Sequence, residues 1–202
     1  MTVISQFRPG DTSFAYSWGI VAMAKVKSLE DINNLGYKEF GDYLANVVAK
    51  TPMIPLAAWS DRPFCSVRDL HATLCKFLDH LPFQGKEGLL RCYPDLPSRL
   101  AISSNSFRDI NEPSRRAGLL TLSSDDLELI TDLNDKYTRK FGFPFVICVN
   151  ESKRHAIVQG LQLRLKHSRQ EEVLMGIANV KQIIWYELFK LVQDTTEDSS
   201  AF

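Results

Sequence analysis

The stretch EEVLMGIANVKQIIWYELFKLV, residues 171–192, decides the fold class of this chain. Its apolar residues recur at steps of four, three, four, four and three, at Val173, Ile177, Val180, Ile184, Leu188 and Leu191. An α-helix turns once in about 3.6 residues, so this spacing places all of them on one face. The stretch therefore predicts one long helix with a single buried stripe.

A second stretch, SSDDLELITDLNDKYTRKF at residues 123–141, repeats this periodicity, with apolar residues at Leu127, Ile130, Leu133, Tyr137 and Phe141. Serine followed three residues later by an acid stands at four predicted helix starts: Ser28/Asp31, Ser66/Asp69, Ser123/Asp126 and Ser168/Glu171. A serine there can accept hydrogen bonds from the free N–H groups of the first turn, and the acid faces the positive end of the helix dipole. These pairs predict where the helices begin.

Strand signals are weak outside FPFVICV, residues 143–149, and an isolated strand or hairpin is not stable in water. We therefore expect a short extended or helical segment that fills the core after a turn at Gly142–Pro144. Two stretches rich in proline or polar residues, 51–64 and 93–119, are interpreted as non-helical. The predicted fold is all-α, a single compact multi-helix domain of about seven or eight helices.

The chain has 202 residues, enough to bury a substantial core without disulfides or metals. We divide it into an N-terminal arm (1–26), a helical domain (27–193) and a polar C-terminal tail (194–202). The apolar run at 14–24 resembles the core of a signal peptide, but Pro9 and Asp11 precede it, so we expect an uncleaved arm. The run is too short to span a bilayer, and no membrane association is expected.

Composition excludes several functions. Lysine plus arginine and aspartate plus glutamate both number 24, whereas a nucleic-acid-binding surface normally needs a basic excess. The four cysteines and four histidines show no spacing typical of a metal site, so we expect no metal and interpret the cysteines as buried free thiols in a reducing compartment. Neither a phosphate-binding loop nor a nucleophile elbow is present in the sequence.

A set of local features in fixed order remains: AAWSDRPF, KEGLLRCYPDL, RRAGL, LNDKYTRKFGFPFV and LQLRL. Together they resemble the OHCU decarboxylases, which act on 2-oxo-4-hydroxy-4-carboxy-5-ureidoimidazoline in urate breakdown, and the resemblance covers residues 27 to 193. The resemblance implies an all-α homodimer with no metal or organic cofactor. It also implies removal of CO2 from a small ureidoimidazoline substrate and delivery of a proton to one face, which gives (S)-allantoin.

The resemblance also implies site residues, carried over position by position. The family arginine corresponds to Arg164, and the FGFPFV block implies pocket walls at Phe143, Pro144 and Phe145. In the family's HPDL motif the proline corresponds to Pro94, but the histidine position is Tyr93. The positions of the family serine and glutamate, counted back from AGL at 117–119, are Ile110 and Pro113.

These departures leave two hypotheses open. A tyrosine has a reference pKa near 10 against about 6.5 for histidine, so Tyr93 could donate a proton but would rarely act as a base at pH 7. Glu112 is a candidate substitute acid if the alignment slips by one residue. The chain is then either an active decarboxylase, with Tyr93 as proton donor and Arg164 holding the substrate, or a pseudoenzyme that binds a small anion or a protein partner. Because the C-terminus lacks an S-K-L-type tripeptide, a cytoplasmic location is preferred over a peroxisomal one.

Overall fold

The computed structural model describes residues 26–49, 51–96, 124–148 and 154–193. Within these ranges the chain forms eight α-helices, one 3₁₀ helix and two short strands, which confirms the all-α prediction. The elements in chain order are β1 (Lys27–Ser28), α1 (Leu29–Asn34), α2 (Tyr37–Tyr43), α3 (Met53–Ala58), η2 (Trp59–Asp61), α4 (Val67–His80), α5 (Phe83–Arg91), α8 (Ser124–Phe141), α9 (Arg154–Arg164), α10 (Arg169–Leu191) and β2 (Val192–Gln193). The N-terminal arm and the C-terminal tail lie outside the described residues apart from Val26, so that division stays a prediction.

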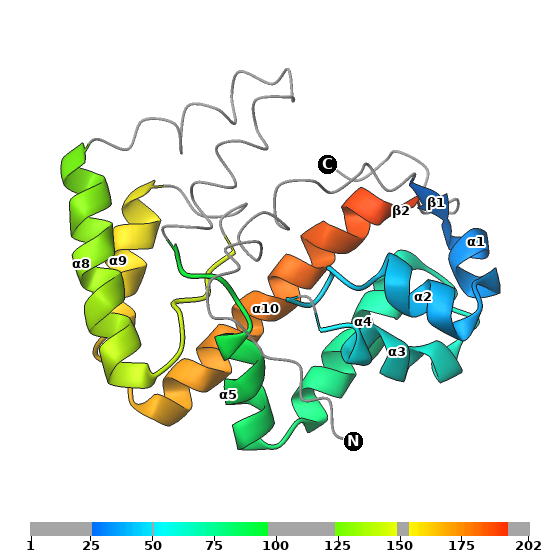
Figure 1. Cartoon of the computed structure of the whole chain (residues 1–202), viewed down its shortest axis with the longest axis horizontal. Helices are drawn as coiled ribbons and strands as arrows, with labels where there is room; N and C mark the ends of the chain where they lie inside the picture. The colour runs from blue at the N-terminus through cyan, green and yellow to red at the C-terminus, as the bar shows by residue number, and fades with distance from the viewer. Residues whose placement is uncertain (1–25, 50, 97–123, 149–153, 194–202) are drawn as a thin grey trace, which may run out of the picture.

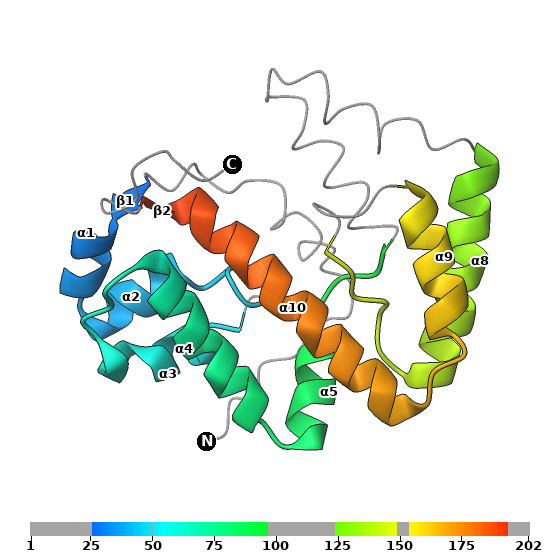
Figure 2. The same ribbon diagram turned by 180° about the vertical axis from the view of Figure 1, so that it is seen from behind.

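Helix α10 is the central helix and runs across the molecule from one end to the other (Figures 1 and 2). Helices α1 to α4 lie on one side of it, the parallel pair α8 and α9 lies at the other end, and α5 packs between them. Five of the six stripe residues predicted on α10 are buried, and Leu191 is half-buried. Gly176 lets α5 approach closely, because a Cβ atom there would lie 2.9 Å from the Leu90 side chain.

The predicted helix starts are confirmed where the structure describes them. Ser28 and Ser168 form complete capping boxes with Asp31 and Glu171 at the starts of α1 and α10. Ser66 accepts from the Asp69 N–H at the start of α4, but the Asp69 carboxylate accepts from the Cys65 N–H instead of closing the box. The fourth pair, Ser123 and Asp126, lies outside the residues whose side chains are described.

The interpretation of residues 51–64 as non-helical was wrong, because this stretch contains α3 and η2. Pro52 is the N-cap of α3 and Pro55 is its third residue. The first N–H groups of a helix have no partner within the helix, so prolines there remove no hydrogen bond. Most of the other proline-punctuated stretch, 93–119, lies outside the described residues.

The segment after α8 fills the core, as predicted, and of the two forms expected for it, extended or helical, it takes the extended one. Gly142 has a positive φ of 75°, a conformation that favours glycine, and it turns the chain out of α8. Residues 144–148 then run without helix or strand hydrogen bonding, and Phe145, Val146 and Cys148 are at most 2% exposed. The rings of Phe141, Phe143 and Phe145 surround Tyr137, with centroids 4.7, 6.1 and 5.1 Å from its ring.

The strands β1 and β2 pair in parallel, and so join the two ends of the described domain. In the described part of the chain, no helix is both long and apolar enough to cross a membrane. All four cysteines are free, but only Cys148 is buried, Cys75 is half-buried, and Cys65 and Cys92 are exposed. The expectation of buried thiols was therefore wrong for Cys65 and Cys92, which lie beside helix ends at the surface.

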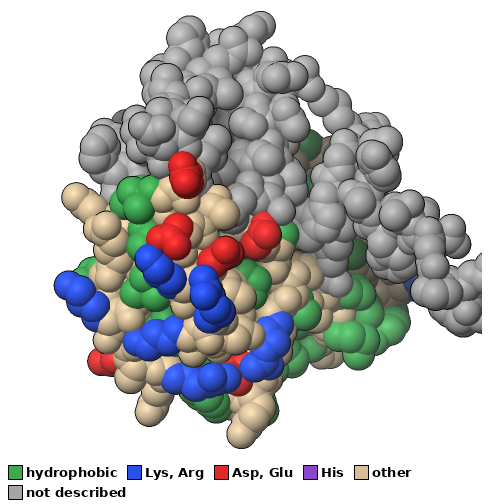
Figure 3. Space-filling model, turned by 60° about the vertical axis from the view of Figure 1, so that its left-hand side comes forward, with side chains coloured by type: hydrophobic (Ala, Val, Ile, Leu, Met, Phe, Trp, Pro, Cys, Tyr) green, Lys and Arg blue, Asp and Glu red, His purple; other side chains and the backbone are tan. Residues whose placement is uncertain are grey.

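The face formed by α8 and α9 gathers Lys and Arg side chains at its lower part (Figure 3). Two lysines of α8 are paired with other groups of the protein. Lys140 in the last turn of α8 donates to the carbonyl oxygens of Leu165 and His167, at 2.7 and 2.9 Å. Lys136 pairs with Asp132 one turn earlier at 2.7 Å. Lys140 therefore ties α8 to the turn that leads from α9 into α10.

A buried carboxylate connects α5 to the start of α10. Glu87, only 7% exposed, accepts from Arg169 Nε at 2.5 Å and from Arg91 Nη2 at 3.0 Å. The hydrogen bond from Arg169, with a further contribution from Arg91, holds the pKa of Glu87 below its ordinary value. A carboxylate with a lowered pKa stabilises the folded state above the pKa of the unfolded chain, and this contribution is lost as pH falls through the folded pKa.

We expect Glu87→Gln to lower the free energy of unfolding by about 1 kcal/mol at pH 7, since the two arginines lose their charged acceptor. Urea unfolding at pH 7 and at lower pH measures this loss. The difference from the unsubstituted protein should be full above the ordinary glutamate pKa of about 4.3, and it should shrink as pH falls from there through the lowered pKa of Glu87. A difference that grows on acidification would contradict the assigned pairing.

Candidate active site

Arg164, the arginine that the sequence analysis singled out, is the last residue of α9 and is only 6% exposed. Its guanidinium stacks on the Phe145 ring, with Cζ 4.4 Å from the ring centroid. Its Nη1 donates to the carbonyl oxygen of Val146 at 2.8 Å. A helix-terminal arginine is ordinarily a solvated cation, whereas burial of the charge requires a partner.

That partner is Glu172, the fourth residue of α10, whose side chain is fully buried. Oε1 of Glu172 accepts from Arg164 Nε at 2.7 Å and lies 2.5 Å from Nη2. The contact with Nη2 lacks hydrogen-bond geometry, so among the described residues Nη2 is a buried donor without a hydrogen bond. Since breaking a buried ion pair costs about 3–5 kcal/mol, Arg164 and Glu172 hold each other in the interior.

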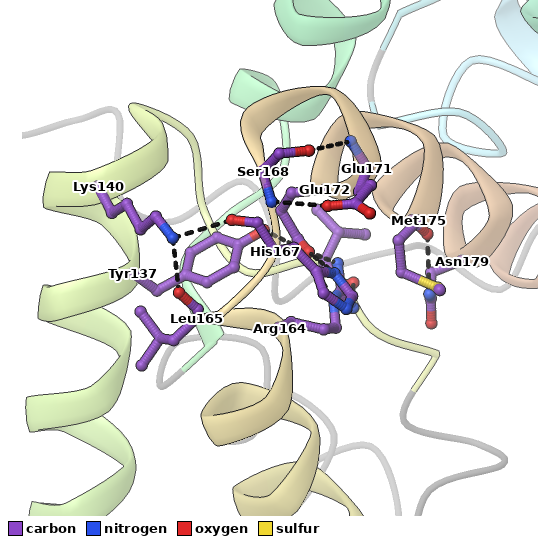
Figure 4. Close-up of polar contacts among 11 residues, drawn as sticks. Tyr137, Lys140, Arg164, Leu165, His167, Ser168, Glu171, Glu172, Met175 and Asn179 are labelled. Atoms are coloured by element: carbon purple, nitrogen blue, oxygen red, sulfur yellow. Dashed lines mark hydrogen bonds and ion pairs between the residues drawn. The ribbon is translucent and has the colours of Figure 1, made fainter.

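Two more side chains complete the cluster around the Glu172 carboxylate. The Tyr137 hydroxyl of α8 donates to Oε1, and His167 Nδ1 lies 2.9 Å from Oε2. Burial, and then the hydrogen bond to Glu172, raise the pKa of Tyr137 far above its ordinary value, so the phenol remains a proton-bearing donor. Figure 4 shows Tyr137, Arg164, His167 and Glu172 converging from α8, α9, the following turn and α10.

Local sequence explains why Arg164 and Glu172 meet. Helix α9 ends at Arg164, and the Ser168–Glu171 capping box starts α10 after a short turn. Glu172 therefore lies in the first turn of α10, where the helix dipole favours a negative charge. The turn itself is held because Lys140 satisfies the carbonyl oxygens of Leu165 and His167.

The residues of the predicted site differ in their burial and in whether they contact Arg164. Phe145 contacts Arg164, while Phe143 packs against Tyr137, and both rings are at most 1% exposed. Pro144 between them is half-buried. These two phenylalanines are thus core residues, and Phe145 is also the stacking surface for the arginine.

Tyr93 follows the C-cap of α5, is 7% exposed, and belongs to the same hydrophobic core as Phe143 and Phe145. After it, Pro94 is half-buried and Leu96 is fully buried. The positions of Ile110, Glu112 and Pro113 lie outside the described residues. Tyr93 and Leu96 therefore lie in the core. The role of Glu112 as a substitute acid stays a prediction.

Glu172, Tyr137 and His167 were missed as a cluster by sequence reasoning. Tyr137 was counted in the apolar stripe of its helix, and Glu172 was passed over beside the capping residue Glu171. One signal was available, because Glu172 lies four and eight residues before Gly176 and Val180, which are buried on α10. An acid at the edge of a buried stripe needs a buried cation.

A shallow groove of about 430 Å³ lies beside this cluster, lined by His167, Glu171, Leu174, Met175 and Ala178. His167 belongs to both, since its Nδ1 faces Glu172 and its side chain is 24% exposed. The buried ion pair is thus separated from this groove by one imidazole ring.

Comparison with known proteins agrees with this architecture. The sequence pattern of the OHCU decarboxylase family matches residues 33–188. The chain is 40% identical over 155 residues to the 2-oxo-4-hydroxy-4-carboxy-5-ureidoimidazoline decarboxylase of Xenopus laevis, which covers 77% of this chain and 89% of that protein.

Two crystal structures share the fold at low sequence identity. One is of (S)-allantoin synthase, with a TM-score of 0.65 at 20% identity, covering 81% of this chain and 54% of that one. The other is of OHCU decarboxylase in the presence of (S)-allantoin, with a TM-score of 0.57 at 16% identity, covering 74% of this chain and 96% of that one. With the family pattern spanning most of its helical domain, this chain belongs to the OHCU decarboxylase family.

Proposed function

We propose that this protein decarboxylates 2-oxo-4-hydroxy-4-carboxy-5-ureidoimidazoline to (S)-allantoin, a step of urate breakdown. The observation that carries the proposal is the 40% identity to the Xenopus laevis decarboxylase over 89% of that protein's length. The buried arginine on the Phe145 ring supports it, because the reaction needs a fixed cation for an anionic substrate.

Arg164 is the proposed substrate-binding residue. A guanidinium carries five N–H groups, and Glu172 and Val146 accept hydrogen bonds from those on Nε and Nη1. Nη2 makes no hydrogen bond among the described residues. Its N–H groups are therefore the proposed donors to a carboxylate or a ureido oxygen of the substrate. We infer that Pro94, Phe143, Pro144 and Phe145 line the apolar side of the same site.

Tyr93 is the proposed proton donor. Loss of CO2 leaves an electron pair on the substrate, and a proton delivered to one face sets the configuration of the product. A phenol can supply that proton at pH 7, although a histidine with a pKa near 6.5 would be a better acid and base. Because Tyr93 replaces the histidine that the family resemblance implies, we expect a slower reaction than in a relative with histidine.

The assembly follows from the same resemblance. We infer a homodimer that works without a metal or an organic cofactor, and light scattering at twice the 23.0 kDa chain mass would support the dimer. The compartment, cytoplasmic in preference to peroxisomal, stays a prediction from the sequence.

The test generates the substrate in place from urate with uricase and hydroxyisourate hydrolase, and follows the chirality of allantoin by circular dichroism. Since uncatalysed decay is racemic, we expect an excess of (S)-allantoin when this protein is added. No enantiomeric excess would overturn the proposal in favour of a pseudoenzyme that binds a small anion or a protein partner.

A double variant tests the role of position 93. Tyr93→His combined with Pro113→Glu restores the histidine and glutamate that the resemblance implies at these two positions, and we expect the initial rate of (S)-allantoin formation to rise by about tenfold or more. The measurement uses the same circular dichroism assay at equal protein concentration. A rate that stays at or below that of the unsubstituted protein would show that position 93 does not donate the proton.

A further inference from the structure

We propose that Glu172 is a positioning residue, which orients the guanidinium of Arg164 for substrate binding. This inference rests on the proposed function, because it assigns to Arg164 the task of holding the substrate. Glu172 is fully buried, and its oxygens lie within hydrogen-bond distance of three side chains from α8, α9 and the turn before α10. No contact with the substrate is needed for this role.

Glu172 fixes the orientation of the Arg164 guanidinium. It engages the edge formed by Nε and Nη2, at 2.7 and 2.5 Å, while Val146 O accepts from Nη1 at 2.8 Å and Phe145 covers one face. An arginine side chain loses about 2 kcal/mol of rotamer entropy when it is ordered. Because the protein orders Arg164 beforehand, the substrate does not have to, and the guanidinium keeps one orientation.

The carboxylate is itself prevented from turning away. Tyr137 donates to Oε1 from α8, and His167 Nδ1 contacts Oε2 from the turn before α10. The backbone is held as well, because the Glu172 N–H donates to Ser168 O at 3.0 Å in the capped first turn. The raised pKa of Tyr137, caused by burial and by Glu172, keeps that donor protonated at neutral pH.

An alternative role for Glu172 is purely electrostatic, and it predicts the opposite result. A negative charge beside Arg164 weakens the attraction for an anionic substrate, so removing it would strengthen binding. Orientation through hydrogen bonds predicts weaker binding instead. Glutamine retains an acceptor oxygen for Arg164 but not the charge, whereas leucine of similar size retains neither, and the two substitutions therefore separate the roles.

The experiment compares Glu172→Leu and Glu172→Gln in the (S)-allantoin assay. We expect Glu172→Leu to raise the apparent KM about tenfold or more with kcat within about threefold, and Glu172→Gln to stay within about threefold of the unsubstituted protein in both. The matched control is Glu87→Leu, which removes another buried carboxylate paired with arginines and should leave KM unchanged. An equal KM for Glu172→Leu and Glu87→Leu, or a lower KM for Glu172→Gln, would overturn the inference.

A milder variant covers the case in which Glu172→Leu does not fold. Tyr137→Phe keeps the ring and removes only the hydroxyl that donates to Glu172, and we expect KM to rise about threefold. An unchanged KM in a folded Tyr137→Phe protein would count against Glu172 as the residue that positions Arg164.

A readout without activity distinguishes failure of this inference from failure of the proposed function. The Nε–H proton of Arg164 is measured by ¹H–¹⁵N NMR, and it should exchange slowly with solvent in the unsubstituted protein and at least tenfold faster in Tyr137→Phe or Glu172→Leu. If the unsubstituted protein yields racemic allantoin but this difference is found, the proposed function fails and the positioning of Arg164 stands. Equal exchange rates overturn the positioning even in an active protein.

Discussion

Arg164→Met is expected to lower kcat/KM for (S)-allantoin formation by about 100-fold or more and to lower the free energy of unfolding by about 3–5 kcal/mol. The activity falls because the cation proposed to hold the substrate is gone. The stability falls because the Glu172 carboxylate, which is fully buried, loses its ion pair. Circular dichroism of the product measures the first effect, and urea unfolding measures the second.

Two further variants separate these effects. Arg164→Met combined with Glu172→Met removes the whole ion pair, and more than half of the lost stability should return, although no activity should. Arg169→Met removes a half-exposed arginine of the Glu87 pair and should cost much less stability than Arg164→Met, with unchanged activity. If Arg164→Met were no more destabilising than Arg169→Met, the buried pair would not contribute as described.

Phe145→Ala is expected to lower the free energy of unfolding by about 3–5 kcal/mol and the melting temperature by about 10 °C. The ring is fully buried, lies against Tyr137 with a centroid distance of 5.1 Å, and supports the Arg164 guanidinium. Its removal leaves a cavity that neighbouring residues fill only in part. Differential scanning calorimetry and urea unfolding check the prediction.

The controls for Phe145 test its two roles. Phe83→Ala, at a phenylalanine that is 38% exposed on α5, should cost much less stability, and an equal cost would contradict the core assignment. Phe145→Leu keeps most of the volume and should cost less than about 1.5 kcal/mol, but it removes the aromatic face beneath Arg164. We therefore expect Phe145→Leu to raise the apparent KM although the free energy of unfolding changes little.

Several helix starts and buried faces could be predicted because the information for them is local. Ser168 and Glu171 lie three residues apart and mark the start of α10 without any help from the rest of the chain. The stripe from Val173 to Leu188 repeats at helical spacing, and all five of its residues are buried. The prolines at 52 and 55 misled the sequence reasoning, since the same residue type breaks a helix interior and is tolerated in a first turn.

The family could also be identified from the sequence, and the buried Arg164 was among the residues that the resemblance singled out. The blocks FGFPFV and LQLRL were sufficient to single out Phe145 and Arg164, and the family pattern does match the chain. The sequence could not show whether Arg164 is buried or exposed, because an arginine on a helix can be either.

By itself, then, the amino-acid sequence determined the all-α class, the course of α8 and α10, and the family to which the chain belongs. Only the tertiary structure decided that Arg164 is buried and that Glu172 is its partner. The physical reason is that periodicity and capping depend on residues within a few positions of each other. The charge on Glu172, in contrast, is balanced by groups that come from α8, α9 and the turn between α9 and α10, and only the packed fold brings them within hydrogen-bond distance.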